Sequence, residues 1–137
     1  MEYLKSFTLF CIGALGYGII ELLYRGYTHI TMGVLGGICM LFISIADSFR
    51  KSFFSSLLCA LVCGAFITLM EGAMGNFLNV RLGLNIWDYS EAGLNLYGQV
   101  SLKFSFVWVL VSFLTMHVNS FIICRLFCEH KNIYKTT

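Results

Sequence analysis

Four long apolar runs constrain this chain more than any other feature of its sequence. They cover about residues 6–25, 28–47, 53–74 and 104–126. A helix needs about 20 largely apolar residues to cross the hydrocarbon core of a bilayer, where its backbone hydrogen bonds have to be satisfied internally. We therefore predict an all-α fold, an integral membrane four-helix bundle formed as a single domain over residues 1–137.

The composition agrees with a membrane environment. Hydrophobic residues make up 58% of the chain and charged residues 12%, against about 45–50% and 25% in soluble domains. The first run is too long for a signal peptide and contains Glu21, so we expect it to be retained. The net charge of +2 is small and dispersed. We therefore expect the lipid bilayer, and no nucleic acid, as the partner of this surface.

The distribution of basic residues predicts the orientation. In a four-span arrangement one side carries Lys5, Arg50, Lys51, Arg125, Lys131 and Lys135, and the other carries Arg25, Arg81 and Lys103. Short cytoplasmic segments of membrane proteins carry the excess of lysine and arginine. The bias of six to three therefore predicts that both termini are cytoplasmic.

The six cysteines lie in or beside apolar runs, at positions 11, 39, 59, 63, 124 and 128. Cys59 and Cys63, like Cys124 and Cys128, share a helical face, but no further Cys or His completes four metal ligands at a suitable spacing. Cysteine in an apolar setting behaves as a small packing residue. We expect free, reduced thiols, no metal site and no cofactor.

Two further expectations concern Asp47, near the cytoplasmic side of the predicted bundle, and the fourth apolar run. Asp47 is close in sequence to Arg50 and Lys51, and we expect it to be exposed as a topology anchor. The fourth run lacks glycine and is rich in bulky residues. It is predicted to be a peripheral or lipid-facing helix with a polar stripe at His117 and Ser120.

Charged residues inside the apolar runs are the candidate functional site. A charge at mid-bilayer costs about 2.5–3.5 kcal/mol, so each requires a partner or a function. Glu21 and Arg25 share a helical face, with His29 close by, and Glu71 should reach the same depth. Glu71 has no basic neighbour along its own helix, so Arg25, His29 and Arg81 are its candidate partners. We predict a substrate or proton site here. A static network, an anion pocket and a proton relay remain open, as does a plain interfacial ion pair at Glu21 and Arg25.

The connection between the third and fourth runs is too polar to span a membrane and too aromatic for a free loop. Its motif residues are Trp87, Asp88, Tyr89, Ser90, Asn95 and Gly98. The two aromatic rings suit the membrane interface, Asp88 or Ser90 could accept from free backbone N–H groups and cap a helical turn, and Asn95 and Gly98 suit a tight turn. We predict an ordered outer loop over the helix ends, with direct substrate contact as the alternative.

Two stretches of the sequence resemble a known family. The run IELLYRGYTHITMGVLGG, residues 20–37, resembles the IE-x-x-x-RG-x-[ST]H-x-x-M-x-x-x-GG signature of the CmpB-like group of small bacterial ABC-transporter permeases. The run GLNIWDYSEAGLNLYGQVSLKFSFVW is similar to the WDYS-x-x-x-x-N-x-x-G block of that group and the apolar helix after it. The matching positions are Glu21, Arg25, Gly26, His29, Gly36, Gly37, Glu71, Trp87, Asp88, Tyr89, Ser90, Asn95, Gly98 and Trp108. The block often has proline and phenylalanine where this chain has Gly93 and Leu94.

The resemblance implies a transport component of the bacterial cytoplasmic (inner) membrane, either homo-oligomeric or joined to a partner membrane or ATPase subunit. The residues themselves show no nucleophile in context, no phosphate-cradling glycine loop and no HExxH helix, so no catalytic residue is assigned. Two other functions stay open. One is an intramembrane enzyme that uses Glu21, Glu71 or Asp88 as acid and base, and the other is a non-catalytic assembly or regulatory subunit.

Overall fold

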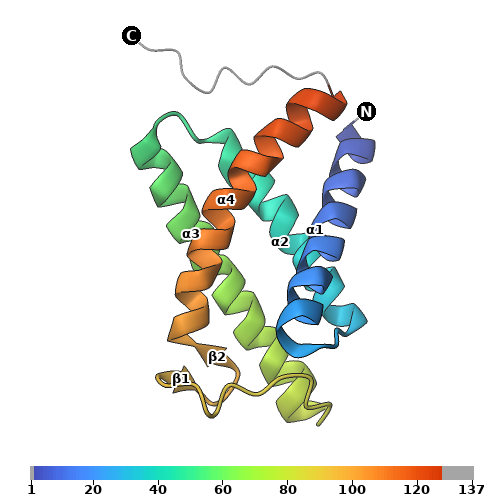
Figure 1. Ribbon diagram of the computed structural model, residues 1–137, viewed down its shortest axis with the longest axis vertical. Helices are drawn as coiled ribbons and strands as arrows, with labels where there is room; N and C mark the ends of the chain where they lie inside the picture. Colours follow the sequence, from blue (N-terminus) through green and yellow to red (C-terminus); the bar gives the residue numbers. More distant parts are fainter. Residues whose placement is uncertain (1, 128–137) are drawn as a thin grey trace.

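The computed structural model describes residues 2–127. It contains the helices α1 (Glu2–Arg25), α2 (Ile30–Ser48), α3 (Phe53–Gly75) and α4 (Leu102–Phe127). Each is long and apolar enough to cross a membrane, which confirms the predicted helical fold with four such segments. The first residues of α1 and the last residues of α4 lie at the same end of the molecule (Figure 1). We call this the terminal end, and the opposite end the cap end.

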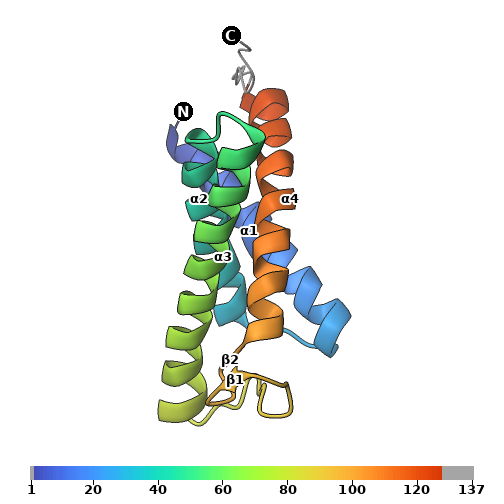
Figure 2. The same ribbon diagram turned by 90° about the vertical axis from the view of Figure 1, so that its left-hand side faces the viewer.

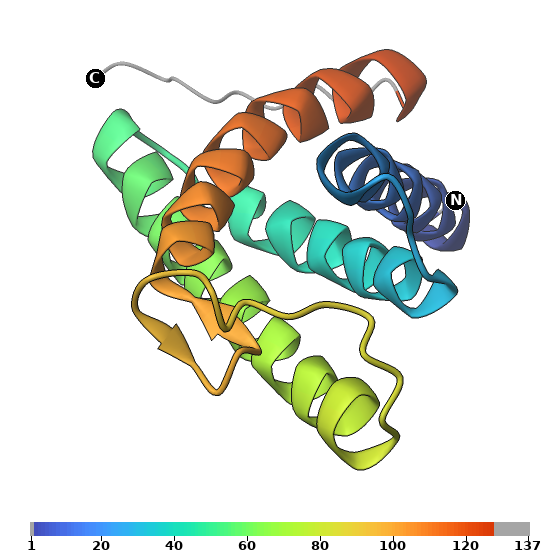
Figure 3. The ribbon, with the colours of Figure 1, turned by 60° about the horizontal axis from the view of Figure 1, so that its bottom comes forward.

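The helices form two antiparallel pairs. α1 packs along α2, and α4 packs along α3, while α2 also touches α3 and α4. Viewed from the cap end, α2 lies between α1 and the α3–α4 pair (Figure 3). The molecule therefore consists of two helical hairpins that meet mainly through α2.

The closest helix contact in the first hairpin lies at Gly13 and Gly36. A Cβ atom added to Gly36 would be 2.3 Å from the Cβ of Tyr17 and 2.7 Å from the carbonyl oxygen of Gly13. Only glycine permits this approach, and small residues are what bring helix backbones together where lipid provides no hydrophobic drive. The contact also fixes where Tyr17 lies on the inner face of α1.

The third helix is longer than its apolar run predicts. It continues beyond Gly75 as a π-helical segment, η1 (Asn76–Arg81), so that the whole helix covers 29 residues. η1 extends past the α1–α2 connection at the cap end (Figures 1 and 2). Gly83, with a φ of +65°, ends it by adopting a left-handed conformation that glycine accepts without strain.

Residues 82–101, which we call the cap, close this end of the bundle. They contain a short antiparallel hairpin of β1 (Asn95–Leu96) and β2 (Val100–Ser101). Tyr97 and Gly98 have φ values of +51° and +69°, and the N–H of Gln99 donates to the carbonyl of Leu96 at 3.0 Å. Two positive φ angles in this position are typical of a type I′ turn, whose twist matches that of the strands.

A second polar cluster lies at the terminal end, and it contradicts the expectation that Asp47 is exposed. Only 1% of Asp47 is accessible. Arg50 Nε lies 2.9 Å from Asp47 Oδ1, and Asp47 Oδ2 accepts from Asn119 Nδ2 at 2.8 Å and from Ser120 Oγ at 3.1 Å. Asp47 is buried because α4 brings an amide and a hydroxyl to it. We call Asp47, Arg50, Asn119 and Ser120 the terminal-end cluster.

The prediction for the fourth helix is wrong only for His117, since α4 leaves large apolar side chains such as Phe106 and Leu114 exposed, and Ser120 bonds Asp47. α4 buries Trp108, Ser112 and Asn119 against the other helices. His117 is exposed, with Nδ1 2.8 Å from the carbonyl oxygen of Phe113. Ser112 and Asn119 of α4 therefore point inward, and the amide N–H of Asn119 finds a hydrogen-bond acceptor there in Asp47.

Some earlier expectations fall on residues that the structure does not describe. Cys128, Lys131 and Lys135 lie outside the described residues, and the two lysines contribute to the predicted orientation. Within the described residues the cysteines have free thiols: Cys11, Cys39, Cys59, Cys63 and Cys124.

Candidate functional site

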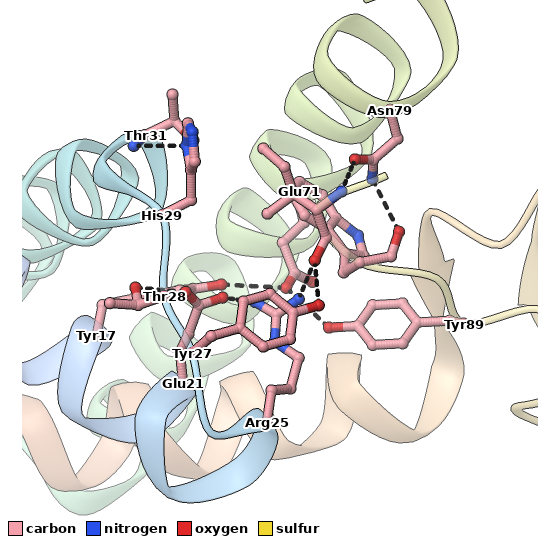
Figure 4. A network of polar contacts seen from close by, with 12 residues as sticks. Tyr17, Glu21, Arg25, Tyr27, Thr28, His29, Thr31, Glu71, Asn79 and Tyr89 are labelled. Carbon is pink, nitrogen blue, oxygen red and sulfur yellow. Dashed lines mark hydrogen bonds and ion pairs between the residues drawn. The ribbon is translucent and has the colours of Figure 1, made fainter. Parts of the chain in front are cut away.

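Glu71 is the centre of a polar cluster at the cap end. It lies one turn before the end of α3 and is only 1% exposed. Trp108 Nε1 donates to its Oε2 at 2.8 Å, and the hydroxyls of Tyr17 and Tyr89 donate to its Oε1 at 3.2 and 3.4 Å. Figure 4 shows the two tyrosine hydroxyls turned toward this carboxylate. The three donors come from α4, α1 and the cap, so this one acid links α3 to all three.

Glu21 and Arg25 form an ion pair beside Glu71. They are one turn apart on α1, and the guanidinium contacts Oε1 of Glu21. Thr28 Oγ1 donates to the other oxygen, Oε2, at 2.7 Å. Arg25 also donates from Nη1 to the carbonyl of Ile86 at 3.0 Å, and the hydroxyl of Tyr27 donates to the same oxygen at 2.8 Å. The end of α1 is thereby bonded to the cap.

The ion pair and Glu71 belong to one network. Three residues that bond Glu71, namely Tyr17, Tyr89 and Trp108, line the same cavity as Glu21 and Arg25. Tyr17 also stacks on Trp108 with ring centroids 5.3 Å apart. In a poorly solvated interior such polar groups interact more strongly than in water, and an unpaired one is costly. We call the group the cap-end cluster: Tyr17, Glu21, Arg25, Glu71, Tyr89 and Trp108.

Asn79 of η1 fixes the path of the cap. Its Nδ2 donates to the carbonyl of Trp87 at 2.9 Å and to Gln99 Oε1 at 2.8 Å, while its Oδ1 accepts from the N–H of Ile86 at 2.7 Å. Trp87 is 3% exposed and donates from Nε1 to the carbonyl of Gln99 at 3.1 Å. The ring of Trp87 therefore lies inside the cap.

The remaining loop motif residues bond to the loop itself. Asp88 Oδ1 accepts from the N–H of Ser90 at 2.8 Å, and this hydrogen bond lowers the pKa of the exposed Asp88 carboxyl. Asn95 Oδ1 accepts from the N–H of Gly98 at 3.0 Å, and the carbonyl of Gly98 accepts from the N–H of Tyr89 at 2.7 Å. Asp88 supports a turn here, and no helix follows it. These bonds give the motif a structural role.

Two of the predicted site residues lie apart from the cluster. The ring of His29 bonds Thr31 and caps the start of α2, with Nδ1 2.8 Å from Thr31 Oγ1. Thr28 occupies the place beside Glu21 that was expected for His29. Arg81 is exposed on η1 and has no ion-pair or hydrogen-bond partner among the described residues.

Sequence reasoning missed Tyr17 and did not place Tyr89 or Trp108 beside Glu71. Tyr17, Glu21 and Arg25 are spaced by four residues, and that spacing could have placed Tyr17 on the same face of α1. Trp108 stood out only through its match to the family block. Asn79 gave no signal, because its role depends on the path of the cap.

The fold and the cluster define a small integral membrane protein with several membrane-spanning helices and buried charges near one end. The chain belongs to the family described as "Putative ABC-transporter type IV" (ABC_trans_CmpB), whose model matches residues 3–136. The family resemblance of the two sequence motifs is therefore confirmed. The comparisons with curated proteins and with solved structures gave no match.

Proposed function

We propose that this chain is a membrane-spanning transport component of a bacterial cytoplasmic membrane, and that the cap-end cluster is its working site. The observation that carries the proposal is the position of Glu71, which is 1% exposed and accepts hydrogen bonds from α1, α4 and the cap. A buried acid inside a membrane helix is costly and usually marks a transport pathway.

The hydrogen bonds that Glu71 accepts support a contact that a proton or a bound cation could break. An indole N–H can only donate, so the Trp108 bond requires an acceptor at Oε2. A proton or a cationic group bound at Glu71 would compete with Trp108 and the two tyrosines for the carboxylate oxygens. Losing those bonds would loosen α1 and the cap from the α3–α4 hairpin. In this proposal the site couples binding to separation of the two hairpins, with the cap remaining as an ordered cover.

The energy source in this proposal is a partner. The sequence shows no phosphate-cradling glycine loop, whereas the family is named for ABC transport. We therefore propose that a partner ATPase subunit supplies ATP hydrolysis, and that the chain functions as a homo-oligomer or with that subunit. Both termini would face the cytoplasm, as the basic residues predict.

The test first cross-links the tagged chain to its neighbours in the native membrane and recovers any ATPase bound to it. The chain and that ATPase are then reconstituted together into vesicles. We expect the wild-type chain to stimulate ATP hydrolysis in vesicles. Glu71→Gln should remain folded and still recover the partner, but lose the stimulation. Glu91→Gln is the matched control, because Glu91 is exposed in the cap. If Glu71→Gln stimulates hydrolysis as the wild type does, the proposed site is wrong.

Other results would favour the two alternatives. Activity of the purified chain alone on a lipid or peptide substrate would indicate an intramembrane enzyme with Glu21 and Glu71 as paired carboxylates. Recovery with a complex unrelated to transport would indicate an assembly or regulatory subunit. Either result would overturn the proposal of a transport component.

A further inference from the structure

A lateral groove runs between α1 and α4. Each of these helices packs mainly on its own hairpin partner, and the space between them holds two adjoining cavities. The one toward the cap has a volume of about 280 Å³ and the deeper one about 190 Å³. Both are lined by Tyr17, Ile20, Trp108 and Val111, so they form one continuous groove from the cap-end cluster into the centre of the bundle.

The deeper part of the groove is apolar and has room to spare. Its walls include Ile12, Met40, Ile43 and Val118. Gly16 also lines it, and a Cβ atom added there would meet no atom within 4 Å. A space with such walls attracts little water, because Thr115 is one of few polar residues that line it. Hydrocarbon is the filling that its chemistry fits.

The mouth of the groove combines aromatic and apolar walls with three charged residues. Glu21, Arg25 and Lys103 line it, together with Tyr24. Glu21 and Arg25 form an ion pair, and Glu71 does not line the mouth but lies behind it, hydrogen-bonded to Tyr17, Tyr89 and Trp108. Lys103, at the start of α4, is exposed and has no ion-pair partner among the described residues.

We propose that an anionic membrane lipid occupies this groove, with an acyl chain along the apolar walls and its phosphate beside Lys103. The charged residues at the mouth and the apolar interior follow the order of a lipid headgroup and its acyl chain. Lipid binding does not require the transport role, so it is tested separately.

The experiment measures quenching of Trp108 fluorescence by lipids brominated on the acyl chain. The chain has two tryptophans, so a Trp87→Phe background leaves Trp108, which lines both parts of the groove. The protein is reconstituted into phosphatidylcholine vesicles that contain brominated phosphatidylglycerol or brominated phosphatidylcholine at the same mole fraction. We expect the site to prefer the anionic lipid about fivefold. This is the preference that corresponds to about 1 kcal/mol, the attraction of one lysine to an anionic membrane surface.

Variants of the groove decide where the quenching originates. Gly16→Leu should fill the deeper part of the groove and abolish the stronger quenching by brominated phosphatidylglycerol than by brominated phosphatidylcholine. Val111→Phe is a second variant for which we expect the same result. Lys103→Gln should remove the preference for anionic lipid while chain quenching persists. Gly18→Leu is the matched control, because Gly18 lines a separate cavity between α1 and α2.

Three results would overturn the proposal. Equal quenching by the two lipids would show contact with bulk lipid and no anionic site. Quenching that both Gly16→Leu and Val111→Phe leave unchanged would place the lipid elsewhere. Absence of quenching by either lipid would show that a protein segment, such as a helix of a second copy or of a partner, covers the groove.

Discussion

Asn119 of α4 donates a side-chain N–H to Asp47 Oδ2, at the end of α2, over 2.8 Å. Arg50 completes this contact, since its Nη2 donates to Ser120 Oγ at 2.7 Å while its Nε faces the other oxygen of Asp47. The two hairpins are thus fastened by buried polar groups at the terminal end.

The cap end is fastened in the same manner but through other helices. There Tyr17 of α1 donates to Glu71 of α3, and Arg25 bonds the cap through Ile86. The lateral groove lies between the two fastened ends. Under the proposed transport role, this arrangement would allow the hairpins to separate at one end while the other end holds them together.

The first prediction concerns the terminal-end cluster. Arg50→Met should destabilise the folded protein by about 3–5 kcal/mol, because it removes the guanidinium and leaves the carboxylate of Asp47 in a poorly solvated site. Unfolding in a fixed detergent, followed by helicity, measures the change. Arg125→Met is the control, since Arg125 is exposed near the end of α4 and such surface changes stay within about 0.5 kcal/mol. Equal effects of the two substitutions would contradict the prediction.

The second prediction concerns the contact of α1 with α2. Gly36→Ala would place a Cβ atom 2.7 Å from the carbonyl oxygen of Gly13, so the helices have to separate at a cost of about 1–3 kcal/mol. Gly16→Ala is the matched control on α1, because its added Cβ meets no atom within 4 Å and alanine favours helix. The same unfolding measurement should show a loss of stability for Gly36→Ala and no loss of stability for Gly16→Ala.

The helices were predictable from sequence because hydropathy depends on a local window of about 20 residues. The outer part of α3 was not, because η1 contains polar residues and is held by contacts with the cap. The ion pair of Glu21 with Arg25 follows from spacing within one helix. His29 was wrongly placed with them because α1 ends at Arg25 and Gly26 has a φ of +77°, after which helical spacing no longer applies.

Contacts between helices were beyond what one sequence allows. The burial of Asp47 depends on Asn119, 72 positions later in the chain. Likewise, the bond of Trp108 to Glu71 depends on how far α3 and α4 are rotated about their axes. Hydropathy predicts the presence of a helix but not this rotation, so the sequence did not show that Asn119 is buried while His117 is exposed.

The third prediction concerns the turn of the cap. Gly98 has a φ of +69°, and an added Cβ atom would lie 2.7 Å from Asp88 Oδ1. Gly98→Ala should therefore destabilise the cap by more than about 1 kcal/mol. We expect slow amide exchange at Tyr89 and Gln99 in the wild type and faster exchange in this variant. Gly93→Ala is the control, since an added Cβ there meets no atom within 4 Å. Rapid exchange throughout the wild-type cap would contradict its expected order.

The last prediction concerns Tyr89 at high pH. Burial, and next the negative charge of Glu71, raise the pKa of Tyr89 above its usual value, which is about 10. The unfolded chain then loses this proton at a lower pH than the folded protein does. Stability from this residue is therefore fully present below pH of about 10 and falls as the pH rises further.

Phenolate absorbance of the wild type minus that of Tyr89→Phe isolates the titration of this one residue. We expect no phenolate signal in the difference until the pH exceeds about 10. Tyr89→Phe should also weaken the fall of stability above that pH, because phenylalanine has no proton to lose. Phenolate formation at or below the usual value, in protein that retains its helicity, would show that the Tyr89 hydroxyl is not held against Glu71.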